Sequence, residues 1–275
     1  MKCSNSLALW LCLAALPAGA QAELAAMDDG SLRDVTGQSG ISIELEAKMT
    51  IGEFRYTDDG SLAVSDIFIG GANRDDMFPE LGFAIPNEAT DWLDNVRMDI
   101  DVLDDGDAVI NVLPLYGSPV DFAVRTGSWQ LLPESGPADG TILADNLNLE
   151  GIFGSFRAHI DNQTGKMNIQ TRFAVDDLDV DVPFLAMGIR DLRITGPDYG
   201  TAPGESENVV RVFTLADFDI YKAPNAANED SLAVDINAFD ADVHVGSVLL
   251  GGTSIGSVHL DNLSIHNTKM RVYGH

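Results

Sequence analysis

The sequence predicts an all-β fold: an extended, mostly antiparallel sheet, sandwich-like or solenoid-like, with one short N-terminal helix. Apolar and polar residues alternate along most of the chain, as in VRMDIDVL, VVRVFTLADFDIYK and VDINAFDADVHV. This alternation places one set of side chains on a buried face and the other in water, which is typical of antiparallel strands with one wet face. Segments rich in Gly, Pro, Asn and Ser separate the alternating runs, and helical signals are few.

The start of the chain has the layout of a Sec signal peptide. Lys2 precedes an apolar run that ends near Ala20, and the sequence AQA predicts cleavage after Ala22. The run is too short for a membrane anchor. Cys3 and Cys12 are the only cysteines, so cleavage would leave a chain without a disulfide or a thiolate metal site. We therefore expect an exported protein of the periplasm, cell surface or extracellular space, with no transmembrane segment after the leader.

The region that follows the leader carries the main helical signal. Leu32 and Val35 are three residues apart, the Asp pair before them can cap a helix, and Gly37 can end it. A second candidate helix is EATDWLDNV at 88–96. The resulting division of the chain is a signal peptide at 1–22, a short N-terminal helix segment at 23–40 and a single β domain at 41–275.

The chain is strongly acidic. It has 16 basic and 43 acidic residues, and loss of Lys2 with the leader gives 15 − 43 = −28. Such a surface repels phosphate backbones and anionic lipid heads, which excludes nucleic acid and disfavours peripheral membrane binding. The charge is typical of a soluble protein that resists non-specific association.

Two Asp-Asp-Gly segments are predicted to form three-residue hairpin loops, at 58–60 and 104–106. Only this loop length keeps the flanking apolar residues on one face of each hairpin. The expected pairs are Tyr56 with Leu62 and Phe54 with Val64, and Val102 with Ala108, Ile100 with Ile110 and Met98 with Val112. Because such a loop is a type I turn followed by a left-handed residue, we expect positive φ at Gly60 and Gly106.

Neither segment fits an EF-hand calcium loop. With Gly60 at the sixth position, Arg55 and Thr57 occupy ligand positions, and with Gly106 there, Leu103 does. Calcium held by Asp residues that cluster in space stays an open alternative. We expect no cofactor otherwise, and the metal ligands stay unknown at this point.

One local pattern recurs: apolar, any residue, Asp or Asn, apolar, any residue, apolar. It occurs as VSDIFI, VDDLDV, IRDLRI, LADFDI and LDNLSI, with ADNLNL as a weaker copy. The intervals are irregular, so this is not a fixed-period repeat. A polar residue that interrupts the alternation suits a strand start or a bulge, and we interpret the pattern as a reused strand start.

The apparent catalytic and metal motifs favour structural interpretations. GTSIG at 252–256 matches a nucleophile elbow around Ser254, but the alternating SVHLDNLSI that follows predicts a strand, where the elbow needs a helix. His244 and His259 lie between apolar residues as outward strand positions, and with His266 and His275 they show no zinc spacing. A carboxylate pair of the glycosidase kind would arise by chance among so many Asp and Glu residues. We expect no catalytic residue and no enzyme.

The segment MDDGSLRDVTGQSGI resembles the start of a family of secreted proteobacterial proteins of unknown function, typically apolar-Asp-Asp-x-x-Leu-x-x-Val-Thr-Gly-Gln-x-Gly-Ile. The resemblance extends through IGEFRYTDDGSL, IFIGGAN, GDAVINV, DFDIYK, GGTSIGSV and the final MRVYGH. Some relatives with this start look like pilus-assembly proteins of Fil-type operons. The resemblance implies a structural role at the cell surface or in the periplasm, and it supplies no catalytic residues.

Together these features predict a non-enzymatic structural protein, filament- or pilus-associated or an adhesion component. Its exposed strand edges would pair with other copies or other surface proteins. The alternative is a periplasmic module that binds an apolar, lipid-like ligand, because long alternating strands can enclose a groove. An outer-membrane barrel is disfavoured, since aromatic residues are 7% of the chain and such barrels carry aromatic girdles.

Overall fold

The computed structural model of the chain describes residues 40–81, 89–134, 140–200 and 211–274. The chain divides into units 1–37 and 38–275, and all described residues lie in the second. The predicted leader and the helix signal at Leu32–Gly37 therefore lie outside the described residues. The helix predicted at 88–96 is wrong where it is described, because strand β4 begins at Leu93. There the alternation of VRMDIDV outweighs the weak helical signal before it.

The described part of the chain is almost entirely strands. The first seven are β1 (Ile41–Ala47), β2 (Met49–Thr57), β3 (Gly60–Gly70), β4 (Leu93–Val102), β5 (Ala108–Pro114), β6 (Val120–Thr126) and β7 (Trp129–Pro133). The others are β8 (Thr141–Asp161), β9 (Lys166–Val182), β10 (Met187–Thr195), β11 (Thr214–Pro224), β12 (Asp230–Leu250) and β13 (Thr253–Val272). Two short 3-10 helices are η1 (Pro79–Leu81) and η2 (Pro183–Leu185). No helix among these residues is long and apolar enough to cross a membrane.

All thirteen strands belong to one sheet, and every pairing is antiparallel. The antiparallel all-β prediction is confirmed. A path across the sheet runs β1-β4-β5-β8-β9-β10-β12, with β13 paired outside β12. One connected sheet takes the place of the separate layers of a sandwich or the coils of a solenoid.

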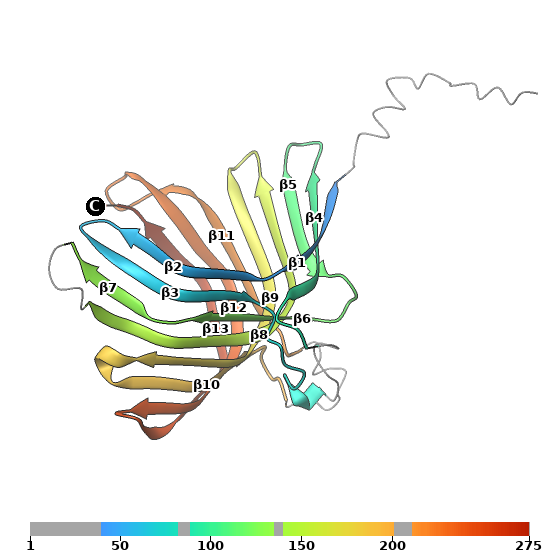
Figure 1. The fold of residues 1–275 in the computed structure, drawn as a ribbon. Helices are drawn as coiled ribbons and strands as arrows, with labels where there is room; N and C mark the ends of the chain where they lie inside the picture. The colour runs from blue at the N-terminus through green and yellow to red at the C-terminus, as the bar shows by residue number, and fades with distance from the viewer. Residues whose placement is uncertain (1–39, 82–88, 135–139, 201–210, 275) are drawn as a thin grey trace, which may run out of the picture. The chain divides into compact units, whose positions relative to one another are not determined.

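The sheet splits into two arms because its longest strands change neighbours along their length. One end of β8 pairs with β5, and the other end pairs with β6 and β7. In the same way β9 and β12 pair with β11 at one end and with β10 at the other. In Figure 1 the arm with β4, β5 and β11 points up, and the arm with β2, β3, β7 and β10 points left. We call the region where the arms meet the waist.

The two faces of the sheet differ in polarity. One row of paired residues crosses eight strands and is apolar up to its last member: Ile41, Ile100, Ile110, Ala158, Ile169, Phe218, Ile236 and Thr268. The neighbouring row, on the other face, is polar with one exception: Ser42, Asp99, Asn111, Arg157, Gln170, Asp217, Ala238 and His266. The alternation in the sequence thus creates one apolar and one polar face.

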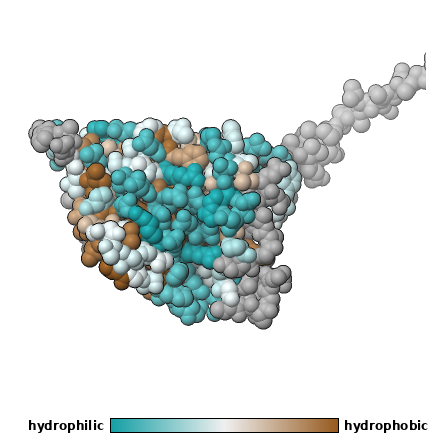
Figure 2. All heavy atoms as spheres, turned by 60° about the horizontal axis from the view of Figure 1, so that its bottom comes forward, coloured by the Kyte–Doolittle hydropathy of each residue, from teal (hydrophilic) through white to brown (hydrophobic). Residues whose placement is uncertain are grey.

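The molecular surface shows the same division of polar and apolar residues. Figure 2 shows a face on which hydrophilic residues dominate, with hydrophobic residues gathered toward the left, the end where Figure 1 shows several hairpin tips. At one hairpin tip, that of β9 and β10, Phe184 and Leu185 of η2 are 54% and 52% exposed. Apolar groups are therefore accessible at the ends of the strands as well as on one face.

In four of its six copies the recurring Asp/Asn pattern places a left-handed residue inside a strand. Asp or Asn residues with positive φ, between 51° and 57°, interrupt five strands: Asp66, Asn95, Asn146, Asp191, Asn262 and Asn267. Four of them are the third residue of a predicted pattern. A left-handed residue uses one position without extending the strand, so the apolar face continues at the next position. The predicted strand start is wrong for these four copies, because their third residues lie within strands. At LADFDI it agrees with the structure, since β11 begins at Thr214.

Neighbouring groups accommodate the left-handed residues. The backbone N–H of Asp191 donates to Asp179 Oδ1 (2.9 Å), and that of Asn262 donates to Asp242 Oδ1 (2.7 Å). A Cβ atom on Gly246, opposite Asp191, would lie 2.7 Å from the Asp191 Cβ. Carboxylates and a glycine on adjacent strands thus satisfy or make room for the bulge.

The predicted hairpin registers are confirmed. All five expected pairs are present: Tyr56–Leu62, Phe54–Val64, Val102–Ala108, Ile100–Ile110 and Met98–Val112. Gly106 has the expected positive φ of 88°, whereas the prediction for Gly60 is wrong. Gly60 belongs to β3 and pairs with Pro133 of β7, so a third strand holds it in the sheet.

The best-buried core lies at the waist. The loop between β3 and β4 contributes Ala72, Met77, Phe78 and Leu81, which pack with Ala123, Ile152, Ala174 and Val212. Phe78 is 0% exposed and meets the ring of Tyr199 edge to face, with centroids 6.1 Å apart. Two connecting segments, one before β4 and one before β11, thus cover the sheet where its arms meet.

Candidate functional site

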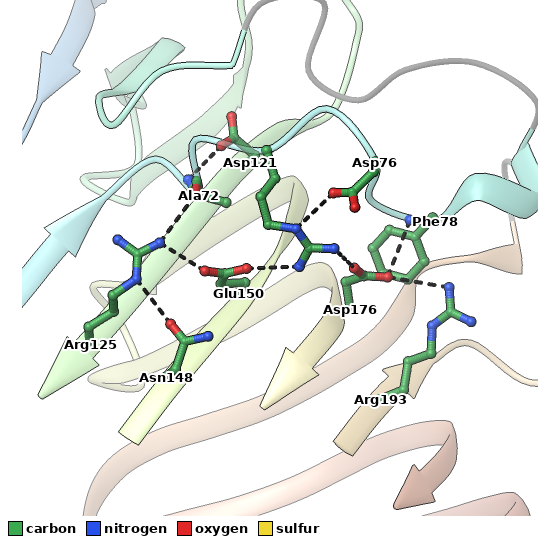
Figure 3. A network of polar contacts seen from close by, with 10 residues as sticks. Ala72, Asp76, Phe78, Asp121, Arg125, Asn148, Glu150, Asp176 and Arg193 are labelled. Carbon is green, nitrogen blue, oxygen red and sulfur yellow. Dashed lines mark hydrogen bonds and ion pairs between the residues drawn. The ribbon is translucent and has the colours of Figure 1, made fainter. Parts of the chain in front are cut away.

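A network of charged groups fixes the loop between β3 and β4 to the waist (Figure 3). Arg74 Nη1 donates to Glu150 Oε2 (2.8 Å), and Arg74 Nη2 donates to Asp176 Oδ2 (3.1 Å). Arg125 Nη2 donates to the other Glu150 oxygen (2.8 Å) and to the backbone oxygen of Ala72 (3.2 Å). Glu150 is thus held by two guanidinium groups, which keep its pKa below its ordinary value although burial acts the other way.

Asp176 connects the same network to the core. Its Oδ1 accepts the backbone N–H of Phe78 (3.2 Å) and an N–H of Arg193 (3.3 Å), and the Arg193 guanidinium lies 5.0 Å from the Phe78 ring centroid. Charges, backbone and aromatic ring therefore constrain one another. Because every contact here stabilises the covering loop, we interpret the network as structural.

An acidic cluster lies beside this network. Asp177, Asp179 and Asp191 each place a carboxylate oxygen within 4.8 Å of the others. Burial, followed by the charges of Asp179 and Asp191, raises the pKa of Asp177 to about 6. The Asp177 Oδ1 atom is buried and accepts no hydrogen bond from the residues described. Three carboxylates offer the hard oxygen ligands that Ca²⁺ prefers, but they are fewer than the six to eight it takes.

Ser254 does not lie in a nucleophile elbow. It belongs to β13, pairs with Leu249 and shares a hydrogen bond of 2.7 Å with the Ser247 hydroxyl. Gly252 has positive φ at the turn before the strand. The strand-to-helix geometry that the elbow requires is replaced by the end of a β-hairpin.

The histidines occupy the strand positions expected of them. His244 and His259 face each other across β12 and β13, with ring centroids 5.7 Å apart. His266 Nε2 lies 3.0 Å from Asp240 Oδ1, and His275 lies outside the described residues. Among the described residues, the cluster that could hold a metal ion is Asp177, Asp179 and Asp191, and it contains no histidine.

Strand β13 forms one edge of the sheet. It runs for 20 residues, pairs with β12 alone in the described chain, and is exposed at nearly every position. Large apolar side chains are accessible along it, including Ile255 (64% exposed) and Val272 (57%). Such an edge presents unpaired backbone N–H and C=O groups to any further strand.

Strands β1 and β2 form the opposite edge. They follow each other with one residue, Lys48, between them, and each has a single partner among the described strands, β4 and β3 respectively. All of β2 is exposed, with Phe54 at 53% and Tyr56 at 60%. The molecule therefore ends on both sides in long, accessible strands, and these two edges are the candidate functional surface.

The sequence contained signals for the edges but not for the charged network. Arg74 lies 76 residues from Glu150 and 102 from Asp176, so no local spacing connects them. The acidic trio combines two copies of the Asp pattern, VDDLDV and IRDLRI, on paired strands. A prediction that these two copies pair in a hairpin would therefore have located the acidic cluster.

Residues 1–104 match the model of a family of unknown function, DUF6160. In the described chain the match extends from β1 through β4, which includes one of the two sheet edges. No curated protein and no solved structure gave a significant match.

Proposed function

We propose that the protein is an exported, non-enzymatic structural subunit of the cell surface or extracellular space that assembles through its exposed strand edges. The observation that carries the proposal is the pair of accessible edges, β13 on one side and β1–β2 on the other. Natural sheets usually shorten, cover or block their edges, because an unprotected edge recruits further strands. Here both edges are long and carry exposed apolar side chains.

The acidic surface fits this role. A net charge of −27 repels like molecules at long range and keeps single subunits soluble. Salt or divalent cations screen that repulsion, so association should rise with ionic strength. A filament, a pilus-associated component or an adhesive layer would each use such a subunit.

The test is sedimentation velocity and light scattering of the purified protein over a wide concentration range, with and without Ca²⁺ or added salt. We expect concentration-dependent oligomers that grow with salt, and elongated particles in negative-stain images. A protein that stays monomeric under all these conditions would refute the proposal.

A second candidate function rests on the apolar face. The apolar row from Ile41 to Ile236 could hold a lipid-like ligand against the sheet. Mass spectrometry of an organic extract of the native protein tests this candidate. A stoichiometric lipid would favour it, and an extract without lipid would remove it.

A further inference from the structure

We infer that a second copy of this chain adds head to tail, with its β13 edge pairing along the β1–β2 edge of the first. This inference rests on the proposed function and specifies its partner and geometry. Three properties of the two edges support it: strand direction, the matching of faces, and charge.

Strand direction is compatible with continuous addition. The path β1-β4-β5-β8-β9-β10-β12-β13 contains eight strands and therefore 8 − 1 = 7 antiparallel steps. An odd number of reversals means that β13 runs opposite to β1. A copy related by a simple repeat thus brings its β13 antiparallel to β1, and the alternation of the sheet continues without a break.

The faces of the two edges also match. On β1, Ile41, Ile43 and Leu45 alternate with Ser42 and Glu44. On the same arm, the end of β13 after Asn267 presents Met270 and Val272 on the apolar face. They lie opposite Val234 and Leu232 of β12. Head-to-tail addition keeps the apolar faces of both copies on one side, so these side chains would form cross-strand pairs.

The charges on this arm are complementary. Strand β1 carries Glu44 and Glu46, while the end of β13 carries Lys269 and Arg271. In a chain with 43 acidic and 16 basic residues, these two basic residues lie one position apart at the end of β13. In the strand register Lys269 lies opposite Asp235, Arg271 opposite Ala233 and Glu44 opposite Arg97, all on the polar face. The Arg271 guanidinium already forms an ion pair with Asp235 (2.8 Å), so Lys269 is the cation that would meet Glu44. Opposite charges would therefore meet on the same face across the new interface.

Two-fold pairing of β13 with another β13 is the main competing arrangement. It would leave β1 and β2 unused and would place no acidic edge against the basic one. The two arrangements differ in which single-cysteine variants can cross-link, which makes them separable.

The experiment uses protein isolated from cells that express the whole chain, with Cys3 and Cys12 replaced by Ser. The register that sets Glu44 opposite Lys269 also sets Ile43 opposite Met270, so Ile43→Cys places a thiol on β1 and Met270→Cys places its partner on β13, both on the apolar face. A short bis-maleimide linker tolerates a small shift in this register. We expect a covalent dimer when the two variants are mixed, little dimer with either variant alone, and ladders of higher oligomers when one chain carries both substitutions.

Several outcomes would overturn the inference. A dimer of Met270→Cys alone would show two-fold pairing and would leave the proposed function intact. A doubly substituted monomer that cross-links within itself would show that the chain closes its own edges. Assembly without any cross-link would assign the contact to another surface, whereas a protein that never assembles would end the proposed function as well.

A charge exchange provides a second measurement. Glu44→Lys and Lys269→Glu should each lower the association constant at low salt by roughly threefold to tenfold. A mixture of the two variants should regain association, because each variant's altered edge then meets an opposite charge. An unaffected Glu44→Lys variant would contradict head-to-tail pairing.

Discussion

The waist and the edges of this sheet use similar residues to opposite effect. At the waist, Phe78 is fully buried and Glu150 is held by two arginines. On the β2 edge, Phe54 is 53% exposed and Glu53 pairs with Arg55 in solvent. An aromatic ring and a carboxylate–arginine pair stabilise the fold in one place and are available to a partner in the other. The contacts that stabilise the fold and the surface proposed for association therefore lie in different parts of one continuous sheet.

The largest test of this comparison is truncation of an aromatic ring in each region. Phe78→Ala should lower the free energy of unfolding by about 3–5 kcal/mol, since it removes a fully buried ring. Phe54→Ala should cost under about 1 kcal/mol, because its ring is half exposed already. Urea unfolding followed by tryptophan fluorescence measures both. Equal losses would show that the edge carries as much stability as the waist.

The charged network gives the next largest effect. Glu150→Gln should lower the free energy of unfolding by about 2 kcal/mol, because Arg74 and Arg125 lose the negative charge between them. The loss is moderate because water still reaches both arginines. The matched variant is Glu53→Gln, which removes an exposed carboxylate from Arg55. We expect no resolvable change in its unfolding midpoint. A Glu150→Gln variant whose free energy of unfolding is unchanged would contradict a stabilising role for the network.

Asp177 should make stability depend on pH in an unusual direction. Its pKa is raised from 3.8 to about 6, so between these values the folded protein keeps a proton that the unfolded chain has released. The stabilisation that protonated Asp177 contributes is fully present below its pKa in the unfolded chain. It is lost as the pH rises through its higher pKa in the folded protein.

Asp177→Asn should therefore gain stability relative to the original chain between pH 4 and pH 7.5, by about 1–2 kcal/mol after allowing for solvent screening. Thermal unfolding at both pH values measures this difference. Asp59→Asn, in the exposed hairpin loop, is the control and should show no such trend. If the stability difference between Asp177→Asn and the original chain is the same at both pH values, Asp177 does not have a raised pKa in the folded protein.

The smallest effects concern the left-handed bulges. Asn146→Ala in the central strand β8 and Asn262→Ala in the edge strand β13 introduce the same backbone strain, about 1 kcal/mol. In β8 the strain should appear in global unfolding. In β13 local release of the edge can relieve it, so hydrogen exchange of β13 should accelerate while global stability stays nearly unchanged. If both variants lose the same free energy of global unfolding, β13 unfolds only together with the rest of the sheet.

Local sequence features predicted the parts of the fold that depend on local pairing. The registers around Asp58 and Asp104 followed from keeping apolar residues on one face, and the structure contains them. The conformation of Gly60 did not follow, because it depends on Pro133 of β7, more than 70 residues away in sequence. Long-range pairing overrides a turn preference wherever a third strand reaches the turn.

The Asp/Asn pattern shows how a correct observation can receive the wrong interpretation. Its spacing already implied one extra residue between apolar positions, but a strand start and a bulge have the same local signature. Only the pairing of Asn146 and Asp191 within long strands distinguishes them. The charged network had no local signature at all, since it joins the loop before β4 to strands β8 and β9.

Three of the left-handed positions let a strand carry a residue that its partner lacks. In an ordinary strand, gaining one residue turns every later side chain to the wrong face. At Asn95, Asn146 and Asn262 the register shifts by one residue, and apolar residues still follow on the same face. Strands of unequal length can therefore pair here without exchanging the two faces of the sheet.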